Sequence, residues 1–295
     1  MPPLADFLST WTFDPWAAGL LLAAAAGFGW GLRRAGQRGM RWPLHRTAAF
    51  YLLGLGLYAV VSFGFLGAYS SSLRWAFSIR LAVLLFVVPV LMALGKPLTL
   101  ARAALGDTPA GQRLARAARW PMKLFGNAII APLLSVLIFS MMLTPLSGVA
   151  RLSPLAEGLI AVLVPLLGLL LILPITEAGT RTTTSLLMVE FVFAFIELMA
   201  DAIPGILLRL NGHVLDGVAA ASGPAAWFPN PLRDQQLAGD WLWFICEVAD
   251  LPIIVLMFVR FSRTDKREQA DVDALSDDEM DALAEAHLRQ GRAGA

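Results

Sequence analysis

The sequence predicts an all-α membrane protein, and three observations support this fold class. Of the 295 residues, 57% are hydrophobic and 15% are charged, whereas soluble domains average about 45–50% and about 25%. The mean hydropathy is +0.66. Long apolar runs approach the ~20 residues that a helix needs to cross a hydrocarbon core ~30 Å thick. Because strands of a membrane barrel alternate over only ~10 residues, these runs predict helices, and the composition excludes a water-soluble enzyme.

Seven apolar segments predict seven transmembrane helices. Loops that contain charged residues separate most of these segments. The predicted spans are residues 15–32, 47–73, 75–95, 124–150, 158–176, 184–208 and 240–259.

Lysine and arginine residues gather in alternate loops, and this asymmetry predicts the orientation. Cations are concentrated after the first, third and seventh spans, while the other side carries Arg74, Arg151, Arg209 and Arg233. Since positively charged loops stay in the cytoplasm, we expect the N-terminus outside and the C-terminus in the cytoplasm. The clustered cations are Arg33, Arg34, Arg38, Arg41, Arg46, Lys96, Arg102, Arg113, Arg116, Arg119, Lys123, Arg260, Arg263, Lys266 and Arg267.

The predicted organisation is a transmembrane domain, residues 1–260, followed by a charged cytoplasmic tail, residues 261–295. In the tail, Ser276 and Glu279 have the spacing of a capping box. They predict a short amphipathic helix over residues 277–288, which either docks on another surface or frays as a solvated tail.

Charge and cysteine content exclude several other classes of function. Lys and Arg together number 23 and Asp and Glu 22, so the global positive field of a nucleic-acid-binding protein is absent. The single cysteine, Cys246, excludes an intramolecular disulfide and a thiolate zinc cluster. His45, His213 and His287 each stand alone in their regions, which favours solvated side chains over metal ligands.

Three segments together resemble one known family. They are TWTFDPWAAG near the start, LGKPLTLARAAL after the third span and NPLRDQQLAGDWLWFICEVADLP at the seventh. Their order and spacing are similar to those of the CtaG family of cytochrome c oxidase assembly factors, in its actinobacterial form, over most of residues 8–273. The resemblance implies an integral protein of the bacterial plasma membrane, needed to build a haem–copper oxidase and associated with copper handling.

The histidines that the resemblance implies are missing from this chain. Alignment on the Gly-Lys-Pro turn places Phe77 and Leu81 where the family has a His-x-x-x-His pair, a spacing that sets two imidazoles on one helix face for copper. A further family histidine corresponds to Thr144, and those expected near the fifth span are absent from residues 152–163. We therefore expect no cofactor, and no copper on the family's histidines.

Six charged residues within the predicted spans form the intramembrane candidate site. A charged group in a bilayer needs a partner or a water-filled cavity, so we expect these side chains to face the bundle interior and Arg80 to pair with Glu197, Asp201 or Glu247. In one interpretation these residues conduct protons or cations, or bind a haem propionate. In the other, which is favoured, they fix helix register as buried ion pairs. The six residues are Arg80, Glu190, Glu197, Asp201, Glu247 and Asp250.

The segment WFPNPLRDQQ before the seventh span is the predicted partner-contact site. It combines aromatic and proline residues with charges, a mixture suited to a rigid, hydrogen-bonded contact; a turn that closes the bundle is the structural alternative. The contact candidates are Trp227, Arg233, Asp234, Gln235 and Gln236.

These observations predict a non-enzymatic assembly or accessory factor of an aa3-type cytochrome c oxidase. It acts by binding oxidase subunits or a respiratory supercomplex within membrane lipids, without a nucleic-acid partner. One alternative is a copper-delivery factor with methionine or cysteine ligands, such as Met199 and Cys246, since soft sulfur suits Cu(I). The other is a proton or cation transporter that uses the carboxylates of the sixth and seventh spans.

Overall fold

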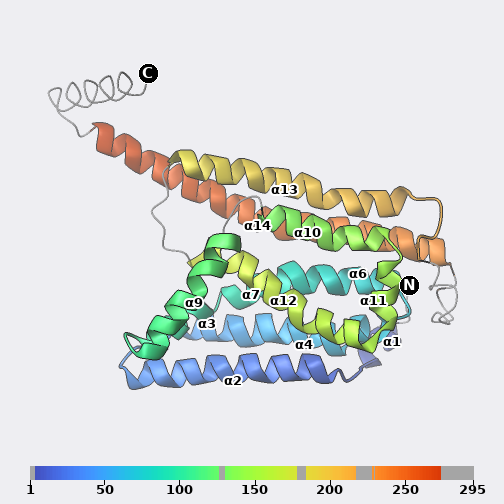
Figure 1. Ribbon diagram of the computed structural model, residues 1–295, viewed down its shortest axis with the longest axis horizontal. Helices are drawn as coiled ribbons and strands as arrows, with labels where there is room; N and C mark the ends of the chain where they lie inside the picture. Colours follow the sequence, from blue (N-terminus) through green and yellow to red (C-terminus); the bar gives the residue numbers. More distant parts are fainter. Residues whose placement is uncertain (1–3, 126–129, 178–183, 217–227, 229, 274–295) are drawn as a thin grey trace.

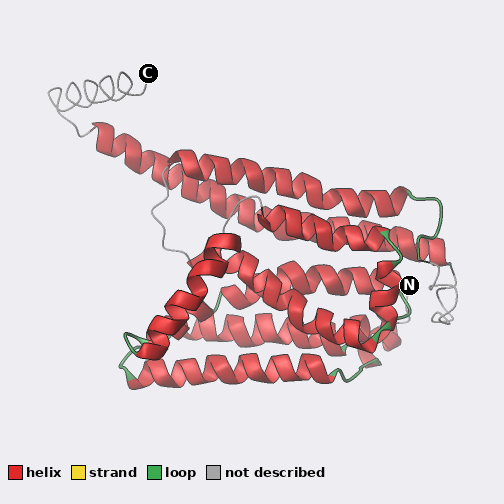
Figure 2. Cartoon of the chain, in the orientation of Figure 1, coloured by secondary structure: helices red, strands yellow, loops and turns green. Residues whose placement is uncertain are grey.

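The computed structural model describes residues 4–125, 130–177, 184–216, 228 and 230–273. Within these residues every regular element is helical (Figure 2), which confirms the all-α class. The helices are α1 (Leu4–Ser9), α2 (Pro15–Gln37), α3 (Leu44–Ala48), η1 (Ala49–Leu55), α4 (Gly56–Phe63), α5 (Phe65–Tyr69), α6 (Arg74–Ala82), η2 (Val83–Val87), α7 (Val88–Ala93), α8 (Pro97–Leu105), α9 (Pro109–Phe125), α10 (Ile130–Ser140), η3 (Met141–Leu143), α11 (Leu146–Leu152), α12 (Pro154–Glu177), α13 (Thr184–Leu210) and α14 (Pro231–Asp273).

Four helices in the described residues are long and apolar enough to cross a membrane. They are Pro15–Gln37, Leu44–Tyr69, Arg74–Ala93 and Pro154–Glu177. The pair Leu133–Leu143 and Leu146–Leu152, bent by 86°, is a fifth candidate. The chain is therefore a membrane protein built from several apolar helices.

The long helices α2, α13 and α14 run roughly along one long axis, whereas α9 and α11 lie across it (Figure 1). Helices α2, α6, α12 and α14 begin at the end of the bundle where α11 lies, here named the α11 end; α8 and α9 lie near the opposite, α9 end. Helices α13 and α14 pack side by side, with α14 against α6 and α13 against α10. Helix α12 packs on α2 and α7.

Glycine residues set the closest approaches between helices. A Cβ on Gly168 of α12 would lie 2.0 Å from the Leu85 carbonyl oxygen. Helices α13 and α14 meet in the same way, because a Cβ on Gly239 would lie 2.5 Å from the carbonyl oxygen of Gly205. Small residues allow this backbone contact, which drives helix association where lipid removes the hydrophobic effect.

The fourth predicted span, residues 124–150, contains a sharp bend of 86°. Helix α10 ends at Ser140, and the extended backbone of Thr144 (φ −121°, ψ 163°) precedes Pro145 before α11 begins. The proline ring disfavours helical geometry in the residue before it, so the chain turns sharply here.

The loops and the C-terminal region also contain more helix than the sequence predicted. The basic loop after the third span folds into α8 and α9. Helix α14 continues to Asp273 and crosses the predicted domain boundary at residues 260–261 without a break. The predicted tail helix, residues 277–288, lies outside the described residues.

Candidate functional site

The carboxylate of Asp234 holds the N-terminus of another helix. It accepts hydrogen bonds from the backbone N–H groups of Arg74 (2.8 Å) and Trp75 (2.9 Å), the first residues of α6. The first N–H groups of a helix have no intrahelical partner, and a carboxylate there also complements the helix dipole. Asp234, predicted as a partner contact, is thus 3% exposed and joins α14 to α6.

Gln235 extends the same junction. Its Oε1 accepts from the Arg74 guanidinium (2.7 Å) and from the Leu215 N–H (2.9 Å), while its Nε2 donates to the His213 carbonyl (2.9 Å). The Arg74 guanidinium also donates to the carbonyl of Met142. One glutamine therefore connects α14, α6 and the segment that follows α13.

A fully buried ion pair lies beside this junction. Arg151 of α11 and Asp216 pair with both side chains 0% exposed. Burial raises the pKa of the Asp234 carboxyl, which precedes the predicted span 240–259, while the N–H groups of Trp75 and Arg74 and the nearby Arg151 and Arg74 guanidinium groups oppose that rise. We name these five residues, Arg74, Arg151, Asp216, Asp234 and Gln235, the junction network.

Arg80 forms a second polar cluster at the α11 end. Its guanidinium lies 2.6 Å from Glu157 of α12 and 3.5 Å from Asp14, and it donates to the Ser70 hydroxyl at 3.0 Å. The hydroxyl of Ser70 donates in turn to Glu157 at 3.0 Å. Arg80 is 1% exposed, so the prediction that it is buried and paired is confirmed.

The predicted partners of Arg80 were wrong. The expectation of Glu197, Asp201 or Glu247 considered only carboxylates within the predicted spans. The side of α6 that carries Arg80 instead faces α12 and the start of α2, where Glu157 and Asp14 lie. Asp14 is also the N-cap of α2, since it accepts from the N–H groups of Trp16 and Ala17.

A third acidic cap lies at the α9 end. Glu177, the last residue of α12, accepts hydrogen bonds from the N–H groups of Leu98 (3.2 Å) and Thr99 (2.5 Å) at the start of α8. The Thr99 hydroxyl donates to the same carboxylate at 2.6 Å. Lys96, with φ at 56°, turns the chain into α8 and donates to the Thr176 carbonyl.

Of the other intramembrane candidates, the structure describes the side chains of Asp201 and Glu247. Asp201 of α13 is 0% exposed and accepts from the Ser135 hydroxyl of α10 at 2.8 Å. Glu247 is half-buried and accepts from the indole N–H of the exposed Trp243 at 3.2 Å. The side chains of Glu190, Glu197 and Asp250 lie outside what the structure describes, although their backbones belong to α13 and α14.

The predicted contact segment divides into buried and exposed parts. Asp234 and Gln235 are buried in the junction network, whereas Arg233 is exposed and Gln236 is half-buried. The Arg233 guanidinium lies 3.5 Å from the Gln236 side-chain oxygen. Trp227 lies outside the described residues.

Phe77, Leu81 and Thr144 occupy positions where the resemblance led us to expect histidines. Phe77 and Leu81 are each 1% exposed and belong to the hydrophobic core, and the Thr144 hydroxyl donates to the Met141 carbonyl at 2.8 Å. Among the described residues, no group of three or more His, Cys, Asp or Glu side chains is arranged to hold a metal ion. Met199 is 49% exposed whereas Cys246 is 1% exposed, so they lie on faces of different exposure.

Sequence reasoning missed Glu157, Glu177 and Asp216. All three lie at or beyond the ends of apolar segments, where an acidic residue is unremarkable. Glu177 is the last residue of α12 and Asp216 lies in the segment after α13. Only the packing of other elements against them, α8 on Glu177 and Arg151 on Asp216, shows their roles. A signal was present for Glu157, which lies in the first turn of α12 after a Ser-Pro pair.

The fold and the site define a class: a helical membrane protein whose buried charges connect helix ends. The family model described as "Cytochrome c oxidase caa3 assembly factor (Caa3_CtaG)" matches residues 26–264. The chain belongs to this family, as the sequence motifs predicted.

The chain is similar to uncharacterized mycobacterial proteins. An uncharacterized protein of Mycobacterium bovis is 28% identical over 305 residues, which cover 95% of this chain and 44% of that protein. An uncharacterized protein of Mycobacterium leprae is 24% identical over 290 residues, or 94% of this chain and 43% of that protein. The chain thus spans less than half the length of these relatives. No solved structure matches the chain.

Proposed function

We propose that this chain is a non-enzymatic assembly factor of a caa3-type cytochrome c oxidase that acts by binding the oxidase or its respiratory assembly. It crosses the bacterial plasma membrane seven times, with its N-terminus outside and its C-terminus in the cytoplasm. The family match supports the assembly role. The burial of Phe77 and Leu81 in the core favours binding over copper transfer.

One observation supports the binding role most directly: the family's polar motifs act within the bundle. Asp14, Asp234 and Gln235 bond to helix ends and to buried arginines. Such bonds hold the helices in register, so the motifs maintain a surface for contact. The chemistry of oxidase assembly then belongs to the partner.

Helix α14 presents the surface best suited to that contact. Trp241, Phe244, Val248 and Leu251 are 41–55% exposed, and their spacing of three, four and three residues places them on one helix face with Arg233. Aromatic and arginine side chains contribute most binding energy in protein interfaces. We name this set the α14 face.

Affinity purification tests the proposal. The tagged chain is isolated from native membranes in mild detergent, and co-purifying proteins are identified. We expect haem–copper oxidase subunits, and we expect the double variant Arg233→Glu/Phe244→Ala to recover at least tenfold less of them. Leu22→Ala on α2, where Leu22 is 68% exposed, is the control and leaves recovery unchanged.

Two results would overturn this proposal. If no oxidase subunit co-purifies with the wild-type chain, the binding role is lost. Stoichiometric copper in the purified protein would instead establish copper delivery by ligands other than the family's histidines.

A further inference from the structure

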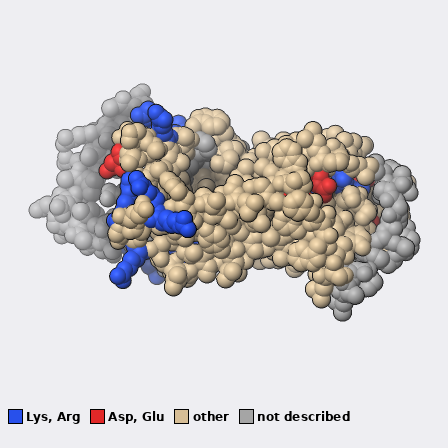
Figure 3. Space-filling view, turned by 90° about the horizontal axis from the view of Figure 1, so that it is seen from below, with Lys and Arg blue, Asp and Glu red and all other residues tan. Residues whose placement is uncertain are grey.

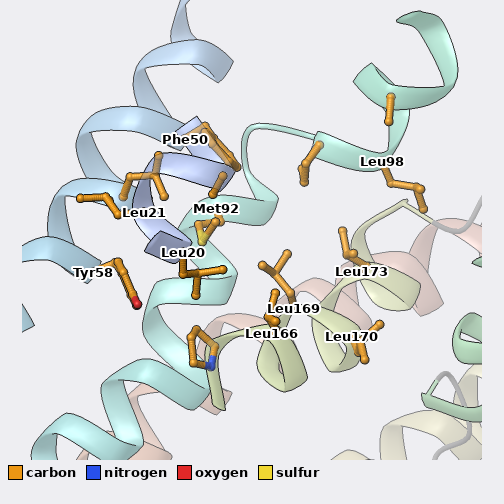
Figure 4. A pocket seen from close by; sticks show the side chains of 15 residues that line it. Leu20, Leu21, Phe50, Tyr58, Met92, Leu98, Leu166, Leu169, Leu170 and Leu173 are labelled. Carbon is orange, nitrogen blue, oxygen red and sulfur yellow. The ribbon is translucent and has the colours of Figure 1, made fainter. Parts of the chain in front are cut away.

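An apolar cavity of about 520 Å³ lies between α2, α4, α8 and α12 (Figure 4). Leucine side chains of α2 and α12 form much of its wall, and Leu166, 41% exposed, shows that it opens on the side of the bundle. The hydroxyl of Tyr58 at its deep end donates to the Ala161 carbonyl at 3.0 Å. Because this hydroxyl is already bonded, the cavity suits a hydrocarbon chain.

This cavity continues toward the α9 end. A second cavity, of about 190 Å³, shares Ala24 and Ala101 with the first and reaches Trp30. A third, of about 450 Å³, shares Trp30 with the second and is lined by Arg33, Arg34 and Arg38. Since neighbouring cavities share lining residues, the three lie in a row along α2, apolar near Tyr58 and lined by arginines at the other end, the mouth. We name this row of cavities the α2 groove.

Small residues on α2 create the space for this groove. Gly31 packs so closely on α8 that a Cβ there would lie 3.2 Å from Leu100. One turn earlier, a Cβ on Gly27 would meet no atom within 4 Å. Helices α2 and α8 are therefore held together at Gly31, and the groove widens on both sides of that contact.

The arginines at the mouth have no acidic partner in the part of the chain that the structure describes. The ion pairs within the described residues involve Arg80, Arg151 and Arg209, which lie away from the mouth. The mouth residues Arg33, Arg34 and Arg38 are exposed. The Arg38 guanidinium lies against Gly106, whose φ of +54° and missing side chain leave room for it. Figure 3 shows Lys and Arg side chains gathered at this end of the molecule.

The dimensions of the groove match one leaflet of a bilayer. Leu20 and Arg33 are separated by about 20 Å along α2, at ~1.5 Å per residue. Half of a ~30 Å hydrocarbon core plus one headgroup layer is about 20–22 Å. A phosphate at the arginines would thus place its acyl chain along the apolar cavity, with the chain end near Tyr58.

We propose that the α2 groove binds one anionic glycerophospholipid. Its phosphate and headgroup pair with Arg33, Arg34 and Arg38, and one acyl chain fills the cavity between α2 and α12. The orientation predicted from the loops puts this lipid in the cytoplasmic leaflet. An arginine cluster that only sets topology needs no cavity beside it. Arg33, Arg34 and Arg38 instead line the cavity at the mouth of the α2 groove, whose other end is apolar.

Native mass spectrometry of the full chain in detergent tests the site. Two lipids with the same chains are titrated: dioleoyl phosphatidylglycerol, which is anionic, and dioleoyl phosphatidylcholine, which is neutral overall. We expect one phosphatidylglycerol per chain to bind at least tenfold more tightly than phosphatidylcholine. Replacing Arg33, Arg34 and Arg38 with Gln weakens it about 100-fold, since each cation near an anionic lipid surface contributes roughly fivefold.

Two control variants distinguish a specific lipid-binding site from non-specific electrostatic attraction of the lipid to basic residues. Replacing the exposed Arg113, Arg116 and Lys123 of α9 with Gln removes the same charge and changes affinity less than fivefold. Ala24→Phe obstructs the groove and weakens binding at least tenfold, whereas Ala23→Phe, on an exposed position of the same helix, does not. Size-exclusion profiles show whether each variant is folded.

Three results would each refute the proposal. They are equal affinity for the two lipids, an equal loss in the α9 triple variant and the α2 triple variant, and unchanged binding in folded Ala24→Phe.

Discussion

Asp234→Ala provides the most direct test of how the motifs stabilise the bundle. The substitution removes both acceptors of the Arg74 and Trp75 N–H groups and leaves the start of α6 without a cap. The site is buried, with Asp234 3% exposed, so water cannot replace the lost bonds. Asp234→Asn keeps one side-chain oxygen as an acceptor and loses the charge.

The expected cost follows from the geometry. Losing a helix cap costs about 1 kcal/mol, and each buried N–H left without a partner costs about 1–3 kcal/mol. These contributions add up to about 3–7 kcal/mol. We expect the lower part of that range for Asp234→Ala, about 3–5 kcal/mol, because this is the cost of removing one partner of a buried charged contact. At ~2–4 °C per kcal/mol for chains somewhat smaller than this one, the thermal midpoint falls by roughly 6–20 °C.

Thermal unfolding in detergent, followed by the near-ultraviolet signal of the tryptophans, measures this shift. The matched control is Asp240→Ala on the same helix, where Asp240 pairs with Arg209 at 2.9 Å and both side chains are 41% exposed. An exposed pair of this kind contributes about 0–1 kcal/mol. If Asp234→Ala lowers the midpoint no more than Asp240→Ala, the capping role of Asp234 is refuted.

Three further substitutions test other contacts of the bundle. Arg80→Leu removes the partner of Glu157, which lowers stability by about 1–3 kcal/mol and so lowers the thermal midpoint. Arg80→Lys restores part of this loss. Equal midpoints for the wild type and both variants contradict the ion pair. Gly168→Ala forces a Cβ against the backbone between α6 and α7 and lowers stability by about 1–3 kcal/mol. The control Gly19→Ala, where a Cβ meets nothing within 4 Å, is neutral or stabilises α2 by about 0.5–1 kcal/mol. If Gly19→Ala is the more destabilising of the two, the close packing at Gly168 is ruled out. Glu177→Ala speeds amide hydrogen exchange in α8 and leaves α6 unchanged, and exchange that is unchanged in α8 contradicts the cap.

The helical class could be predicted from the sequence because it depends on local composition. An apolar run of sufficient length leaves its backbone no partners in lipid except its own, so helices follow without knowledge of the tertiary fold. The bend at Thr144 was missed although a proline marked it, since proline alone within an apolar run is compatible with a spanning helix. Helices α8 and α9 were missed because clustered arginines were interpreted only as topology signals.

The partners of buried charges could not be predicted in the same way. The cost of an unpaired charge in a bilayer correctly indicated that Arg80 is buried, and helical periodicity shows only which residues share a face. The partner depends on which helix packs against that face, and this is decided by contacts between segments far apart in sequence. Glu157 lies 77 residues from Arg80, and Asp234 lies 160 residues from Arg74.

The three family motifs share one physical task, which bears on what family membership implies. Asp14 in the first motif caps α2, Glu177 caps α8 at the Gly-Lys-Pro turn, and Asp234 in the third motif caps α6. An uncapped helix end is costly in or near lipid because no water reaches its free N–H groups. These motifs therefore specify how the helices are joined, and they persist in this chain while Phe77 and Leu81 occupy the positions of the histidines. Phe77 and Leu81 are each 1% exposed in the hydrophobic core, so the capped scaffold forms without a polar side chain at these two positions.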